Sequence, residues 1–109
     1  MKKIFVCSPL RGNEASNKAK ARQYCRDIAL AGDIPIAPHI YFTQFLFDAN
    51  DAERSMGIAA GTALLTLCDE VHVFGKRIST GMCAEIEVAK MCGIPVIYMP
   101  ELEAEDCGW

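Results

Sequence analysis

Short apolar runs alternate with longer amphipathic stretches along this chain. The apolar runs are rich in β-branched and aromatic residues and are closed by Pro, Gly or Ser, which is typical of buried strands. They cover residues 4–7, 34–38, 70–74 and 94–98. The stretches between them carry good helix formers with one polar face, and they predict helices over about 13–31, 51–67 and 81–92. This alternation predicts parallel strands joined by right-handed crossovers.

The predicted fold class is α/β, a small doubly wound parallel sheet of the flavodoxin-like or Rossmann-like kind. Two prolines in the second run remove hydrogen-bond donors and place that strand at an edge, which gives a strand order of about 2-1-3-4. In such sheets a ligand binds at the carboxyl ends of the strands, beside the point where the strand order reverses. That point is formed here by the loops at residues 8–12 and 75–80. The 109 residues are expected to form one domain, 1–109.

The helical stretches also predict which side chains face the sheet. In the first helix the expected inward residues are Ala21, Tyr24, Cys25 and Ile28. In the second they are Met56, Ala60, Ala63, Leu64 and Leu67. Gly57 and Gly61 share a face of that helix, which suggests that another backbone approaches closely there. The aromatic segment 39–47 has no clean period, and the acidic stretch 101–106 is expected to be a short or frayed helix.

Composition narrows the class of protein. The hydrophobic fraction of 51%, the charged fraction of 23% and the net charge of −3 are ordinary for a soluble globular domain. No run of Lys or Arg exceeds two residues, which argues against binding to duplex nucleic acid. The first apolar run stops at Cys7, before a secretory signal could form, and no stretch approaches the roughly 20 apolar residues of a membrane span. A cytoplasmic protein that binds no membrane is expected.

Six cysteines raise the question of a metal site or disulfides. No C-x-x-C pair occurs, and His39 and His72 are not spaced with any cysteine as zinc ligands would be. Most of the cysteines lie in apolar runs, where a thiol behaves as a small hydrophobic group. Buried reduced thiols are expected, with no metal and no organic cofactor.

Glu85 is the most informative residue. On a helical wheel it points along the middle of an apolar stripe, whereas Glu87 and Lys90 point together in the opposite direction. The stripe consists of Met82, Ile86, Val88, Ala89 and Cys92. A buried carboxylate is costly without compensation, but the amino end of a helix stabilises an anion. Glu85 is therefore either a structural carboxylate or a nucleophile or electrostatic stabiliser at the edge of the sheet.

Two loops at the predicted ligand edge carry groups that suit an anion. Ser79, Thr80 and Gly81 open the last helix, where hydroxyls and free N–H groups bind phosphate or simply cap the helix. Ser8, Arg11 and Gly12 follow the first strand, and Arg11 is either a bidentate phosphate ligand or a surface cation. The glycine pattern of dinucleotide-binding folds and the P-loop motif are both missing, which disfavours classical dinucleotide binding and ATPase activity.

Several residues outside these loops have two interpretations. His39, Tyr41, Phe42 and Phe45 follow the second strand on the ligand side, where they either stack on a base or pack in the core or an oligomer interface. For Asp69, at the start of a strand, and His72, inside one, structural roles are favoured.

The chain resembles the nucleoside 2-deoxyribosyltransferase superfamily, and most closely its short bacterial and phage members. This superfamily includes the deoxynucleoside 5′-monophosphate N-glycosidases. The resemblance covers nearly the whole chain and rests on Ile4–Gly12, Cys68–Gly75, Ser79–Ala89 and Gly93–Val96. It implies that Glu85 matches the glutamate that attacks the anomeric carbon, that Ser79 matches the serine of the phosphate-binding turn, and that Arg11 matches the arginine after the first strand.

Two departures from the family pattern refine this expectation. Lys76, Arg77, Ile78 and Ser79 stand where the transferases carry an aspartate, which favours a glycosidase-like, phosphate-directed pocket. Ala60 and Gly61 occupy the region of a second family aspartate. The nearest acids are Asp48, Asp51 and Glu53, of which Asp51 or Glu53 is a candidate replacement. The general acid is therefore unassigned.

Three functions follow as alternatives. The first is cleavage or exchange of the N-glycosidic bond of a nucleoside or nucleoside 5′-monophosphate. The second is a catalytically silent protein that binds or sequesters a nucleotide, and the third is a structural subunit without a ligand. Exposed sheet edges and the aromatic segment predict a homodimer or larger homo-oligomer, and the resemblance implies the same.

Overall fold

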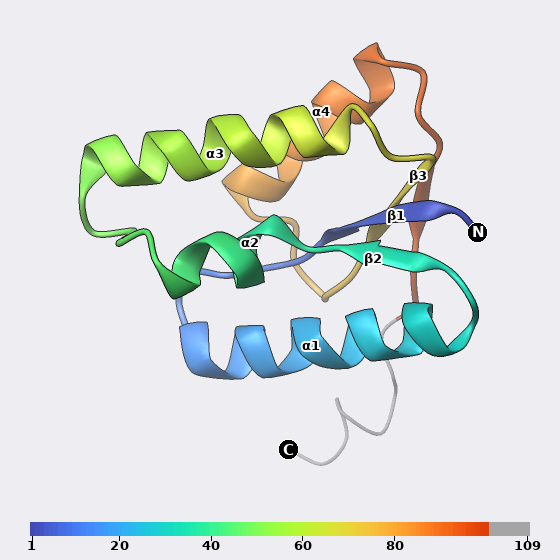
Figure 1. Ribbon diagram of the computed structural model, residues 1–109, viewed down its shortest axis with the longest axis horizontal. Coiled ribbons are helices and arrows are strands. Elements are labelled where there is room, and N and C mark those ends of the chain that lie inside the picture. Colours follow the sequence, from blue (N-terminus) through green and yellow to red (C-terminus); the bar gives the residue numbers. More distant parts are fainter. Residues whose placement is uncertain (101–109) are drawn as a thin grey trace.

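The computed structural model describes residues 1–100 as a four-stranded parallel sheet with helices on both faces (Figure 1). The elements are, in chain order, β1 (Lys3–Cys7), α1 (Glu14–Leu30), β2 (Ile34–Ile36), α2 (Pro38–Tyr41), the 3₁₀ helix η1 (Phe42–Gln44), α3 (Asp51–Leu65), β3 (Glu70–Val73), α4 (Thr80–Met91) and β4 (Val96–Tyr98). The strand order is β2-β1-β3-β4, and every pairing is parallel. This confirms the predicted fold class and strand order. The predicted helix at 101–106 lies outside the described residues.

The apolar character of β1 follows from its central position. Phe5 and Cys7 face α3 and α4, where they join the larger core cluster with Leu65 and Met82. The alternate residues Ile4 and Val6 face α1 and form the smaller cluster. Because consecutive side chains of a strand point to opposite faces, every side chain of a strand covered by helices on both sides is buried, and apolar residues are favoured at each position. Figure 1 shows α3 and α4 on one side of the sheet and α1 on the other.

The two prolines of the second apolar run have different effects. Pro35 lies within β2, which is an edge strand as predicted. Pro38 ends the extended segment earlier than expected, because it occupies the first position of α2, where a missing N–H is tolerated. Most of the aromatic segment that follows is therefore helical, in α2 and η1, and only residues 45–47 lie outside these helices.

The prediction for the inward face of α3 is partly wrong. Met56 and Leu67 are 58% and 65% exposed, and Ala63 is also exposed, whereas Gly61 and Leu65 are buried. The helix ends at Leu65, and α3 packs on α2 as well as on α4. A Cβ at Gly61 would lie 3.3 Å from the Pro38 side chain. The close approach expected at this glycine is found, but its partner is the proline side chain and not another backbone.

The helix α4 follows its predicted pattern except at its end. Met82, Ile86 and Ala89 are buried, Val88 is partly buried, and Glu87 and Lys90 are exposed. Cys92 is exposed, contrary to prediction, because it caps the carboxyl end of the helix. In α1, Ala21 and Ile28 are buried as expected.

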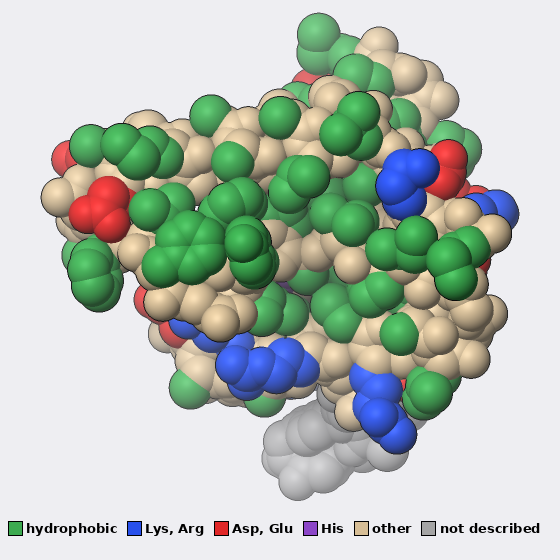
Figure 2. Space-filling model, in the orientation of Figure 1, with side chains coloured by type: hydrophobic (Ala, Val, Ile, Leu, Met, Phe, Trp, Pro, Cys, Tyr) green, Lys and Arg blue, Asp and Glu red, His purple; other side chains and the backbone are tan. Residues whose placement is uncertain are grey.

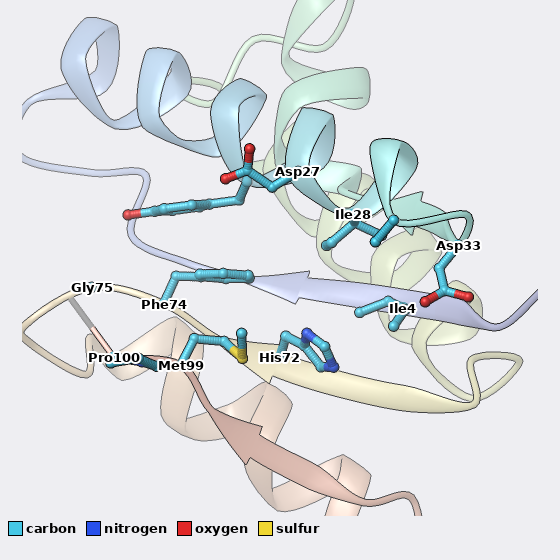
Figure 3. Close-up of a pocket in the computed structure, with 11 residues that line it drawn as sticks. Ile4, Asp27, Ile28, Asp33, His72, Phe74, Gly75, Met99 and Pro100 are labelled. Atoms are coloured by element: carbon cyan, nitrogen blue, oxygen red, sulfur yellow. The ribbon is translucent and has the colours of Figure 1, made fainter. Parts of the chain in front are cut away.

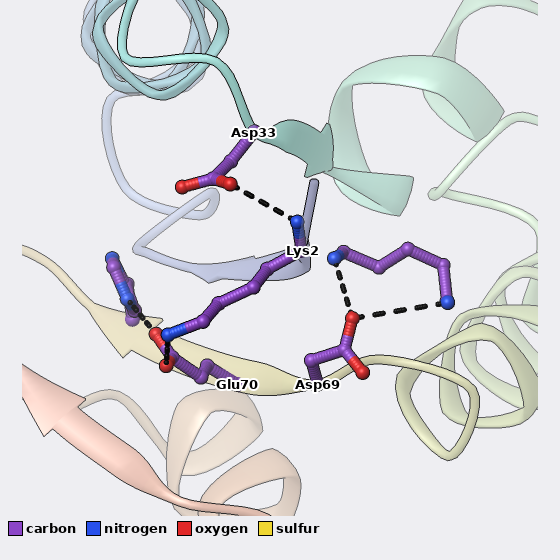
Figure 4. Close-up of polar contacts among 6 residues, drawn as sticks. Lys2, Asp33, Asp69 and Glu70 are labelled. Carbon is purple, nitrogen blue, oxygen red and sulfur yellow. Dashed lines mark hydrogen bonds and ion pairs between the residues drawn. The ribbon is translucent and has the colours of Figure 1, made fainter.

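A polar cluster closes the amino ends of β1 and β3 (Figure 4). The Lys2 ammonium donates to Glu70 Oε2 at 2.7 Å, and the backbone N–H of Lys3 donates to Asp69 Oδ2 at 2.7 Å. The Nε2 atom of His72 lies 2.9 Å from Glu70 Oε1. The structural interpretation of Asp69 and His72 agrees with these contacts. None of the helices in residues 1–100 has the length and hydropathy needed to cross a bilayer.

Candidate functional site

Glu85 lies on the second turn of α4, which begins beside the carboxyl end of β1. The side chain is partly buried, as the helical wheel predicts, and Glu87 on the opposite face is exposed. The Cys7 thiol, at the last residue of β1, contacts both α4 and Glu85: it donates weakly to the Met82 carbonyl at 3.8 Å and interacts with the Glu85 carboxyl. Glu85 is therefore held at the junction of a helix and the central strand.

Burial changes the acidity of both groups at this junction. Loss of solvation raises the pKa of Glu85 to about 7, and the hydrogen bond from the Cys7 thiol offsets only part of that rise. Burial also raises the pKa of Cys7, and the neighbouring Glu85 carboxylate adds to the rise. Cys7 is consequently a neutral thiol, whereas Glu85 exchanges a proton near neutral pH. A carboxyl tuned in this way suits acid, base or nucleophilic chemistry.

The amino end of α4 is arranged as an N-cap. Ser79 precedes the helix, and its Oγ accepts a hydrogen bond from the backbone N–H of Met82 at 3.2 Å. Of the two roles expected for Ser79, helix capping and phosphate binding, this hydrogen bond corresponds to capping. Thr80 and Gly81 are exposed in the first turn, where backbone N–H groups have no acceptor within the helix. These N–H groups and the Thr80 hydroxyl are available to an anion.

Ser8 and His39 form a hydrogen-bonded pair after β1 and β2. The Oγ of Ser8 lies 2.9 Å from His39 Nε2, and Ser8 is 8% exposed. Burial, reinforced by the charge of Lys18, lowers the pKa of His39 to about 4. The imidazole is therefore neutral at neutral pH, so the pair presents a hydroxyl and an uncharged ring rather than a cation. The sequence placed both residues at the ligand edge but did not indicate that they bind each other.

Arg11 is engaged by an acidic partner. Its Nη2 atom lies 2.9 Å from Asp48 Oδ2, and its Nε donates to the same oxygen at 3.1 Å. The Arg11 side chain is 57% exposed. A phosphate would therefore compete with Asp48 for this guanidinium. Gly12, the next residue, has a φ of 102° and turns the chain into α1.

The loops after β1 and β3 touch each other. Gly75 has a φ of 99°, and a Cβ built there would lie 3.1 Å from the Pro9 ring. The sequence placed Gly75 in a loop at the predicted ligand edge but did not indicate this contact. The contact holds the two loops together at the point where the strand order reverses, which is the place predicted for a ligand.

The aromatic residues after β2 are mostly exposed. Tyr41 and Phe45 are 59% and 53% exposed, and their rings meet edge to face with centroids 5.2 Å apart. Phe42, which is partly buried, completes a cluster of three rings. Figure 2 shows apolar side chains gathered over α2 and α3. We call Tyr41, Phe42, Phe45 and Phe47 the aromatic patch.

Two of the three acidic residues near the position of the second family aspartate have structural partners. Asp48 binds Arg11. The Oε1 of Glu53 accepts a hydrogen bond from the backbone N–H of Phe47 at 2.9 Å, which fixes the entry to α3. Asp51 is exposed in the first turn of that helix. None of these contacts involves Glu85.

No metal centre is formed within residues 1–100, where no group of three His, Cys, Asp or Glu side chains is suitably placed. The five cysteines of this part of the chain are free thiols. Cys7 and Cys68 are buried as predicted, but Cys83 and Cys92 are exposed.

Comparison with solved structures supports the expected fold. One similar structure is a 2-deoxyribosyltransferase from Bacillus psychrosaccharolyticus, which is 20% identical with a TM-score of 0.67 over 88% of this chain and 70% of that chain. Another is a 2-deoxyribosyltransferase from Leishmania mexicana, 14% identical with a TM-score of 0.63 over 99% of this chain and 72% of that chain. At these identities the likeness shows a shared fold.

Sequence comparison points to a family without an assigned activity. No curated protein is detectably similar in sequence to this chain. Residues 2–99 match the family described as Domain of unknown function (DUF7768). Because the match spans nearly the whole chain, the protein belongs to this family, and it has the fold of the nucleoside 2-deoxyribosyltransferases.

Proposed function

We propose that this protein cleaves or exchanges the N-glycosidic bond of a deoxynucleoside or nucleoside 5′-monophosphate, with Glu85 as the nucleophile. The observation that carries the proposal is the placement of Glu85: a partly buried carboxyl near the amino end of α4, beside the end of β1, with its pKa raised to about 7. The fold shared with two 2-deoxyribosyltransferases supports the same class of reaction.

The reaction follows the logic of a retaining glycosidase. The ionised Glu85 carboxylate attacks C1′ of the sugar through an oxocarbenium-like transition state, the bond to the base nitrogen breaks with both electrons going to the base, and a glycosyl-enzyme ester remains. Water or a second base then attacks C1′ and releases Glu85. The leaving base takes up one proton. At neutral pH about half of the Glu85 side chains carry the charge required for attack.

The loops around Glu85 supply groups for the rest of the substrate. We infer that the N–H groups of Thr80 and Gly81 bind the 5′-phosphate, together with the Ser79 hydroxyl. The Arg11 guanidinium exchanges its ion pair with Asp48 for one with the phosphate. The Ser8–His39 pair lies at the same edge of the sheet and contacts the sugar or base without adding charge. Of the aromatic residues, Tyr41 and Phe42 cover the base.

The exposed aromatic patch supports a homodimer. Three of its four rings are more than half exposed, and burial of such a surface between two copies would remove it from water. The free thiols of residues 1–100 fit the reducing cytoplasm, where we propose that the protein acts.

A base-release assay tests the proposed activity. Purified protein is incubated with a panel of deoxynucleosides and their 5′-monophosphates, and free base is separated by chromatography. We expect release by the wild type, loss of at least a hundredfold in rate for Glu85→Gln because the nucleophile is removed, and little change for Glu87→Gln, the exposed neighbour on the same helix. For Arg11→Ala we expect a loss confined to the monophosphates.

A nucleotide-binding protein without turnover is the second candidate, because Asp48 and Glu53 are held in structural contacts away from Glu85. Ligand retained on the wild type without free base from any substrate in the panel would select this function and contradict catalysis.

A further inference from the structure

Lys18 lies near the carboxyl ends of the strands although it belongs to α1. The residue before it, Asn17, donates from its side-chain amide to the backbone carbonyls of Leu10 and Arg11, at 3.0 and 3.2 Å. These two hydrogen bonds tie the first turns of α1 to the loop that follows β1. Lys18 is therefore fixed beside the loop that carries Arg11.

Lys18 is also close to the Ser8–His39 pair. Its helix α1 packs on α2, the short helix that contains His39. Burial is the main cause of the lowered pKa of His39, and the positive charge of Lys18 lowers that pKa further. An effect of this kind requires the ammonium group to lie within electrostatic reach of the imidazole. Lys18 and the Ser8–His39 pair thus belong to the same part of the ligand edge.

The positive charge of Lys18 has no acidic partner in the described part of the chain. The ion pairs formed within residues 1–100 involve other cations, and Arg11 is held by Asp48 through two contacts. Lys18 is partly buried, so water screens its charge less than that of a fully exposed lysine. An unpaired and partly desolvated ammonium group with three N–H donors favours a bound anion.

A groove on the α1 side of the sheet does not offer a phosphate an alternative position. It is apolar, has a volume of about 340 Å³, and lies between α1 and the strands β3 and β4 (Figure 3). Among residues 1–100 its lining includes the carboxylates of Asp27 and Asp33 and neither a lysine nor an arginine. Because like charges repel, a phosphate is disfavoured there. The edge of the sheet beside Lys18 is the more favourable position.

We propose that Lys18 binds the phosphate group of the substrate and thereby makes the site select nucleoside 5′-monophosphates over nucleosides. This assignment rests on the proposed function, in which a nucleotide lies at the carboxyl ends of the strands. The ammonium group donates charged hydrogen bonds to the phosphate oxygens, and it does not first have to leave an acidic side chain, as Arg11 does. The Ser8–His39 pair is uncharged, so Lys18 supplies the positive charge in its part of the site.

Titration calorimetry tests the assignment without requiring turnover. Wild-type protein is titrated with the deoxynucleosides of the base-release panel and with their 5′-monophosphates. We expect the wild type to bind the monophosphates more tightly than the nucleosides. In Lys18→Gln this preference should fall by about tenfold or more, because a charged hydrogen bond to the phosphate is lost.

Two variants control for effects that do not involve the phosphate. Lys20→Gln removes the same charge from an exposed position on the same helix and should keep the wild-type preference. Lys18→Arg keeps the positive charge and should retain most of the preference. Unchanged affinity for the nucleosides and an unchanged circular dichroism spectrum show that a variant is folded.

Three results would overturn the assignment of Lys18: no binding of any monophosphate to the wild type, an undiminished preference in Lys18→Gln, or an equal loss of preference in Lys20→Gln. A loss in Arg77→Gln in place of Lys18→Gln would also contradict it, because Arg77 lies in the exposed loop before Ser79. The proposed reaction fails separately. Binding that depends on Lys18 without release of base would contradict catalysis and support this assignment.

Discussion

At the scale of single residues, Glu85 links stability to function. The ionised Glu85 carboxylate lowers the stability of the folded chain because it is partly desolvated, and the raised pKa of Glu85 reflects this loss of stability. The helical wheel predicted this orientation from sequence because the neighbouring residues Met82, Ile86 and Ala89 define the buried face of α4 without ambiguity. By contrast, no local pattern could indicate that Arg11 pairs with Asp48, since that contact joins residues 37 positions apart.

The stability of Glu85→Gln should depend on pH in a defined way. Between pH 4.5 and about 7 the folded wild type retains a proton that the unfolded chain has lost, so rising pH destabilises the wild type through this group. The shift of the Glu85 pKa corresponds to a loss of at most about 3 kcal/mol in the free energy of unfolding. We expect Glu85→Gln to unfold at a higher denaturant concentration than the wild type above pH 7, with the gap shrinking towards pH 4.5.

The control for this measurement is Glu87→Gln, whose side chain is exposed on the same helix and should show no pH-dependent gap. A gap for Glu85→Gln that stays constant from pH 4.5 to pH 8 would contradict the burial of this carboxyl.

At the scale of elements, the positions of the strands were predicted more accurately from the sequence than the buried faces of the helices. The four apolar runs became four strands, because a buried parallel strand needs an unbroken apolar segment. The face of α3 was mispredicted at Met56 and Leu67, because α3 packs on α2 as well as on α4, and the sequence did not reveal α2. The loops after β1 and β3 lie at the carboxyl ends of the strands, as the topology predicts, but their contact through Pro9 and Gly75 depends on three-dimensional proximity alone.

The two glycines of the site loops should respond differently to alanine. Both have a positive φ, which strains any L-residue by about 1–3 kcal/mol. At Gly75 an added Cβ would also press on the Pro9 ring at 3.1 Å, whereas at Gly12 it would meet nothing within 4 Å. We expect Gly75→Ala to be the more destabilising change in denaturant unfolding. Equal losses for both variants would show that the loop contact contributes nothing.

At the scale of the whole molecule, the two faces of the sheet carry core clusters of different size. The face of α3 and α4 carries the larger core cluster and presents Glu85 at its edge. The α1 face carries the smaller cluster and an apolar groove between α1 and the strands β3 and β4. Ion pairs close the amino ends of β1 and β3, and the proposed function places the ligand at the carboxyl ends. Doubly wound sheets bind ligands at the carboxyl ends of their strands, and the two 2-deoxyribosyltransferases of known structure share the fold.

The most direct measurement is a search for a covalent intermediate on Glu85. The protein is mixed with the substrates of the base-release panel, quenched in acid, and analysed as an intact chain and as peptides by mass spectrometry. We expect a glycosyl adduct on Glu85 in the wild type and in Glu87→Gln, and none in Glu85→Gln. Release of base with no adduct at Glu85, or at an undiminished rate in Glu85→Gln, would contradict the assignment of this carboxyl as the nucleophile.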